Sequence, residues 1–118
     1  MLVRSILYAA IVGSMTLSAS AGQFDGLYFP TGMQWSCNPI DVGMDGGALQ
    51  IEGNALIGVE NFCQLSQPTN VRGMDAVLFD ADCAGEGYEY SYRVMLLNKP
   101  DGVYVISEDG VADWTFCK

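Results

Sequence analysis

Apolar and polar residues alternate along much of the chain beyond residue 22, with the period of two that half-buried β-strands show. The clearest strand covers residues 88–97, and its apolar face carries Tyr88, Tyr90, Tyr92, Val94 and Leu96. Residues 75–83 repeat the pattern, with an apolar face of Val77, Phe79, Ala81 and Cys83. Asp80 and Asp82 belong to the opposite, polar face.

Shorter segments with the same alternation, separated by Gly, Pro, Asn or Asp, complete the pattern. We expect further strands over residues 33–37, 47–51, 55–62, 103–107 and 111–117. Expected turns are Gly53-Asn54, residues 66–73, 84–87, 98–102 and 108–110. No segment of helical length after residue 22 has a period of 3.6. The sequence therefore predicts an all-β antiparallel meander of about seven strands, closing as a small barrel or sandwich.

The first 21 residues differ in character from the rest. Arg4 is followed by the apolar run 6–12, and Ala19-Ser20-Ala21 places small residues where a signal peptidase requires them. The run is shorter than the roughly 20 apolar residues that cross a bilayer. We expect residues 1–21 to be a signal peptide cleaved after Ala21, and residues 22–118 to form one periplasmic or secreted domain in which Phe24 is the first core residue.

Four cysteines in a short exported chain indicate two disulfides. Zinc binding is disfavoured because no two cysteines have the C-x-x-C spacing. A hairpin between residues 63 and 83 would place Cys63 opposite Cys83, which leaves Cys37 for Cys117. The alternative pairing, Cys37–Cys63 with Cys83–Cys117, remains open. Strict alternation puts Cys117 on the face away from Trp114, so either a bulge precedes it or its bridge lies at the rim of the sheet.

Charge narrows the choice of partners. Fourteen acidic and five basic side chains give a net charge of −9, and loss of Arg4 with the leader makes it −10. A surface this acidic repels nucleic acid and anionic lipid, and it attracts basic proteins. A simpler explanation is that the excess of acidic side chains only keeps the protein soluble.

The chain has no histidine, which removes the usual general base, metal ligand and pH switch. We expect neither a catalytic site nor a bound cofactor or metal. Glu60 and Glu86 could form a hydrolytic carboxylate pair, although turn carboxylates bonded to the backbone or to Arg72 or Arg93 are the simpler interpretation.

Two further patterns could bind ligands. Residues 41–47 and 80–86 are acidic and contain glycine, but neither fits the twelve-residue calcium loop. The tyrosines at 88, 90 and 92 could line a pocket for a sugar or peptide, although cross-strand core packing is the more ordinary role of such a stripe.

The cysteine neighbourhoods together resemble a group of small exported proteins of Gram-negative bacteria that contain four cysteines. Their pattern is an E-x-x-C, a C-x-x-E-G and an aromatic residue before the last cysteine. Residues 60–63 and 83–87 match the first two elements, and Phe116-Cys117 supplies the end, where such relatives often have Arg-Cys. The resemblance implies export and an all-β fold, and it implies no activity.

Three functions fit these observations. The first is a non-catalytic binding or inhibitor-like module that contacts a basic envelope protein, for example a cell-wall hydrolase. The second is a structural envelope component without a ligand. The third is a small hydrolase that uses Glu60 and Glu86.

Overall fold

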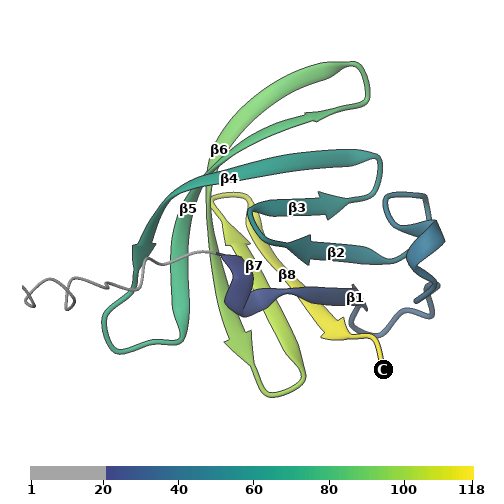
Figure 1. Cartoon of the computed structure of the whole chain (residues 1–118), viewed down its shortest axis with the longest axis horizontal. Coiled ribbons are helices and arrows are strands. Elements are labelled where there is room, and N and C mark those ends of the chain that lie inside the picture. The colour runs from purple at the N-terminus through teal and green to yellow at the C-terminus, as the bar shows by residue number, and fades with distance from the viewer. Residues whose placement is uncertain (1–20) are drawn as a thin grey trace, which may run out of the picture.

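Eight antiparallel strands follow one another around a closed barrel in the computed structural model, which describes residues 21–118 (Figure 1). Each strand pairs with the next along the chain, and β1 pairs with β8 to complete the ring. The strands are β1 (Gly26–Pro30), β2 (Leu49–Glu52), β3 (Ala55–Gly58), β4 (Asn61–Asn70), β5 (Ala76–Gly85), β6 (Tyr88–Lys99), β7 (Gly102–Ser107) and β8 (Gly110–Phe116). Two short 3-10 helices accompany them, η2 (Ala21–Phe24) and η3 (Pro39–Asp41).

The predicted fold class is confirmed, and the barrel rather than the sandwich is the observed closure. The predicted leader lies outside the described residues except for Ala21, so its cleavage stays a prediction. Within the described residues, no helix is both long and apolar enough to cross a membrane.

The strand count is eight rather than about seven because one expected strand is two, another is absent, and β1 was not expected from the sequence. Residues 55–62 divide into β3 and the start of β4, with a turn at Val59-Glu60 between them. Residues 33–37 alternate in sequence but form no strand. They belong to the long loop between β1 and β2, where the Ser36 amide donates to the Gly46 carbonyl across the loop.

The β4–β5 hairpin turns later than the sequence predicts. Its strands extend to Asn70 and from Ala76, so residues 66–70 belong to β4 rather than to a turn. The register shifts between Ser66 and Thr69, and Gln67 has a φ of 53°. Such a bulge accommodates Pro68, which has no amide hydrogen to give to the ladder.

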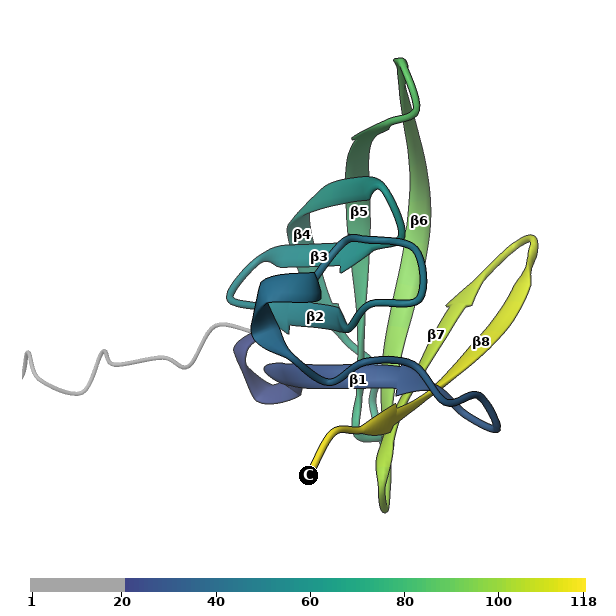
Figure 2. The same cartoon turned by 90° about the vertical axis from the view of Figure 1, so that its right-hand side faces the viewer.

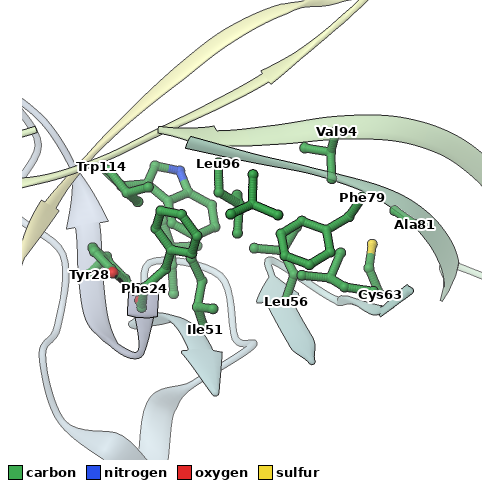
Figure 3. Close-up of a cluster of buried hydrophobic side chains, with 14 of the residues drawn as sticks. Phe24, Tyr28, Ile51, Leu56, Cys63, Phe79, Ala81, Val94, Leu96 and Trp114 are labelled. Atoms are coloured by element: carbon green, nitrogen blue, oxygen red, sulfur yellow. Dashed lines mark hydrogen bonds between the residues drawn. The ribbon is translucent and has the colours of Figure 1, made fainter. Parts of the chain in front are cut away.

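The alternating positions build the core as predicted. Val77, Phe79, Ala81 and Cys83 of β5 are all buried, and they pack inside the barrel against Val94 and Leu96 of β6 (Figure 3). Asp80 and Asp82 face outward, where Asp80 pairs with Arg93 at 3.0 Å and Asp82 accepts a hydrogen bond from Ser91.

Helix η2 closes one end of the barrel. Phe24, the predicted first core residue, is 1% exposed and packs among residues of the core (Figure 3). The hydroxyl of the buried Tyr28 donates to the Phe24 carbonyl. Burial, with a smaller contribution from Asp25, raises the pKa of Tyr28 to about 12. We call this end, with the turns that follow β2, β4 and β6, the closed end.

The disulfides join Cys63 to Cys83 and Cys37 to Cys117, which is the pairing preferred from the sequence. Cys63 and Cys83 lie directly opposite each other on β4 and β5. Cys117 lies just beyond β8, where its amide donates to the Leu27 carbonyl, so no bulge is needed to turn it toward Cys37. This second bridge fastens the β1–β2 loop to the end of the last strand.

Candidate binding site at the open end of the barrel

The end opposite η2 contains a pocket of about 360 Å³. We call it the open end, and it carries the β1–β2 loop and the turns that follow β3, β5 and β7. Apolar side chains of Leu56, Val105 and Trp114 line the pocket together with Cys63. A volume of this order is ordinary for a ligand site.

Polar groups gather on the sides of this pocket. The Asn61 side chain accepts from the Gly58 amide and donates to the Tyr90 hydroxyl at 3.0 Å, which fixes the β3–β4 turn against β6. Ser107 and Asp109 line the pocket from the β7–β8 turn. Burial raises the pKa of Tyr92, and the neighbouring Tyr90 and Asp109 raise it further. The pocket therefore combines apolar walls with a carboxylate near a phenol.

Each two-residue hairpin turn at the open end contains an acidic residue. We call this set the acidic rim, and it consists of Glu60, Glu86, Glu108 and Asp109. Glu60 and Glu86 have positive φ values of 52° and 51°, a conformation that hairpin turns require and that non-glycine residues rarely adopt. No ion pair involves a rim residue within residues 21–118.

The basic side chains lie elsewhere. Arg93 pairs with Asp80 on the outside of the barrel, and Lys99 pairs with Asp101 and Asp113. These contacts raise the pKa of Lys99, chiefly through the hydrogen bond to Asp113, and lower the pKa of Asp113. Arg72 is in the β4–β5 connection at the closed end, and Lys118 follows β8. The open-end turns thus have negative charge without a basic residue among them.

The candidate carboxylate pair, Glu60 and Glu86, is brought to neighbouring turns. β4 and β5 pair Asn61 with Gly85, so the two glutamates are the next residues beyond that pair. A Cβ on Gly85 would lie 2.4 Å from the Glu60 carbonyl, which shows how closely the backbones approach. Both side chains are exposed, and neither lines the pocket. The geometry places them at the rim rather than around a reacting centre.

The tyrosine stripe divides between core and surface. Tyr90 and Tyr92 pack against the core and stack with their ring centroids 6.2 Å apart. Tyr88 is 62% exposed, so the expectation of core packing is wrong for this residue. It lies beside the β5–β6 turn, beyond the region that the barrel can cover.

The two acidic, glycine-containing segments have different structures. Residues 80–85 belong to β5, while residues 41–47 form a turn-rich loop in which Asp41 accepts from the Ser36 hydroxyl at 2.7 Å. Within residues 21–118, no group of three or more Asp, Glu or Cys side chains is arranged to hold a metal ion.

Several pocket residues were not singled out from the sequence. Asn61 comes from the start of β4, and Ser107, Asp109 and Trp114 come from the β7–β8 hairpin, which is distant from β4 along the chain. The sequence feature that could have indicated the acidic turns is the repeated glutamate between two strand-like segments, at Glu60, Glu86 and Glu108.

Comparison of the chain with protein-family models, with curated proteins and with solved structures finds no match in any of the three. The fold and the open-end pocket define a disulfide-linked, eight-stranded antiparallel barrel with one end closed by η2. The two disulfides are consistent with an oxidising, exported location.

Proposed function

We propose that the protein is a non-catalytic binding module of the periplasm or cell exterior that contacts a basic protein through its open end. The observation that carries this proposal is the distribution of charge at that end. Four acidic side chains stand in the three hairpin turns of the end that holds the apolar pocket, Asp109 among them lines the pocket, and these turns contain no basic side chain. Solubility alone does not require this arrangement, because acidic residues spread evenly over the surface and mixed with basic ones would keep the protein soluble as well.

The partner we infer is a basic envelope protein, and a cell-wall hydrolase is a suitable example. An acidic surface accelerates the association of a basic protein, while the apolar walls of the pocket stabilise the complex when water is displaced from them. The barrel presents its turns rigidly, because the disulfides and the ladder hold the strands that carry them. The pocket favours this proposal over a structural component without a ligand.

A binding measurement with purified proteins tests the proposal. We expect the oxidised protein to bind a basic lysozyme at low ionic strength, and to bind more weakly as salt screens the charges. The double variant Glu86→Gln/Glu108→Gln should bind about tenfold more weakly, since rim charges each contribute a fraction of a kcal/mol to a few kcal/mol. Isothermal titration calorimetry at two salt concentrations gives both results.

The matched control removes two charges from the closed end, as Glu52→Gln/Asp101→Asn, and should leave binding nearly unchanged. Basic cytochrome c, which has no cell-wall activity, distinguishes general attraction of cations from recognition of a hydrolase. Equal weakening by both double variants would show that total charge, and not the open end, determines binding. Lack of binding to either basic protein at low salt would contradict the proposed function.

A further inference from the structure

One edge of β6 lacks a neighbouring strand near the open end. β5 pairs with β6 from Tyr88 to Leu97, but β7 pairs with it only from Met95 to Lys99. The chain leaves β7 at Ser107 and turns into β8, so residues 88–94 have a strand on one side alone. Figure 2 shows the tips of the β5–β6 and β7–β8 hairpins diverging from each other.

The hairpins identify which backbone groups face this free edge. The two-residue turn Pro100-Asp101 makes Lys99 and Gly102 a hydrogen-bonded pair, so odd-numbered residues of β6 direct their N–H and C=O groups toward the β7 side. The two-residue turn Glu86-Gly87 leads to the same assignment. It makes Gly85 and Tyr88 a hydrogen-bonded pair, so the even-numbered residues of β6 direct their N–H and C=O groups toward β5. The free groups therefore belong to Glu89, Ser91 and Arg93.

The two faces beside this edge differ in chemistry. On the inner face, Tyr90 and Tyr92 line a hollow that extends to Ser107 and Asp109. On the outer face, a second hollow includes Glu89 of β6 and Asp82 of β5, while the charge of Arg93 is compensated by its ion pair with Asp80. A strand placed along the edge would present alternate side chains to these two faces. Apolar side chains would suit the tyrosines, and lysine or arginine would suit the outer carboxylates.

We propose that an extended segment of the basic partner adds to the sheet as a new strand along residues 88–94 of β6. Backbone hydrogen bonds to Glu89, Ser91 and Arg93 would supply affinity, and the alternating faces would supply selectivity. This inference rests on the proposed function and specifies its mode of contact. A second copy of this chain is disfavoured as the occupant because its net charge is also strongly negative.

Amide hydrogen exchange of the wild-type protein tests the inference directly. In the free protein, Tyr90 and Tyr92 should exchange slowly, while Glu89, Ser91 and Arg93 should exchange fast, since only the first pair is bonded to β5. Addition of a basic lysozyme, or of an extended peptide alternating lysine with valine, should slow the exchange of the three odd-numbered amides at least tenfold. An N-methylated form of the peptide is the control that cannot form the ladder.

A proline substitution gives a second test. Ser91→Pro removes an amide hydrogen that faces the free edge, and proline is tolerated on such edges. Both Ser91→Pro and Ser91→Ala lose the hydroxyl that donates to Asp82, so their comparison isolates the backbone. We expect Ser91→Pro to bind the alternating peptide about tenfold more weakly than Ser91→Ala.

Each outcome supports or overturns the inference. Slower exchange at the odd-numbered amides supports it, even if Ser91→Pro fails to fold. Binding that leaves these amides unprotected, or equal affinity of the two Ser91 variants, overturns the inference and leaves the proposed function intact. Protection that appears on concentrating the protein alone would assign the edge to a second copy and overturn it too. If neither the basic lysozyme nor the alternating peptide binds at low salt, the proposed function and this inference are both overturned.

Discussion

Tyr28 shows how one side chain couples the core to the closed end. It is fully buried, stacks on Phe116 at 4.9 Å between ring centroids, and donates its hydroxyl hydrogen to the Phe24 carbonyl. Burial disfavours the charged phenolate, and the nearby charge of Asp25 disfavours it further, so the pKa of Tyr28 is raised to about 12. The hydroxyl thus makes this contact sensitive to high pH.

We expect alkaline pH to weaken the fold through this residue. The pKa is about 12 when folded and has its ordinary value near 10 when unfolded, so the contribution is complete below pH 10 and is lost between pH 10 and 12. The free energy of unfolding should fall by on the order of 2 to 3 kcal/mol over this pH range. At neutral pH, Tyr28→Phe should lower the free energy of unfolding by about 1 kcal/mol, because the hydroxyl hydrogen bond is lost. In urea unfolding at a series of pH values, the free energy of unfolding of this variant should then fall less between pH 10 and 12 than that of the wild-type protein. Identical pH profiles for the two proteins would refute this.

At the residue scale, sequence alternation predicts orientation well where a strand lies within the barrel. Phe79 and Ala81 are buried, while Asp80 and Asp82 face solvent, as the pattern indicates. It fails at Tyr88, because alternation identifies a face but not how far the opposite wall extends along it. Where β6 extends past its neighbour β7, an inward-facing position has less to pack against.

At the scale of elements, most hairpins with two-residue turns were predicted well, whereas the Val59-Glu60 turn and the β1–β2 connection were not. Gly53-Asn54 forms the expected turn, since Gly53 has a φ of 60° that glycine adopts readily. Residues 33–37 alternate like a strand but have no strand as a partner. Ladder hydrogen bonds come from neighbours, so local pattern alone cannot make a strand.

Gly102 marks a place where two elements approach too closely for a side chain. A Cβ there would lie 1.9 Å from the Trp114 carbonyl on β8. We expect Gly102→Ala to destabilise the fold by about 1 to 3 kcal/mol because the β7–β8 ladder must shift. Gly26→Ala is the matched strand control, since its Cβ would meet side-chain rings rather than backbone, Phe116 at 3.3 Å and Tyr28 at 3.6 Å. Thermal unfolding of the oxidised proteins compares them, and equal stability of the two variants would contradict the argument.

For the whole molecule, the ends of the barrel have different roles. η2 and Phe24 close one end, and the other end holds the pocket and the turns of the acidic rim. Closure of the ring through β1 and β8 lets chain segments 80 or more residues apart share one core. The Cys37–Cys117 bridge stabilises the same long-range closure, with a loop-entropy contribution of about 4.5 kcal/mol.

We expect Phe24→Ala to open the closed end and lower the free energy of unfolding by about 3 to 5 kcal/mol, the usual cost of removing a buried phenylalanine. Phe62→Ala is the control, because Phe62 is 45% exposed on the outside of β4. Denaturant titration measures both. A cost below about 1 kcal/mol for Phe24→Ala would show that η2 merely covers the barrel without completing its core.

The sequence by itself determined the class of this protein. Period-two alternation, turn residues and the cysteine count indicated an all-β, disulfide-linked meander, because these signals depend on residues close in the chain. The tertiary structure decided which strands closed the ring, where the pocket lies, and that four separate acids share one rim. Strand lengths and closure depend on contacts between distant segments, so the free edge of β6 and the open end emerge only when the whole barrel is assembled.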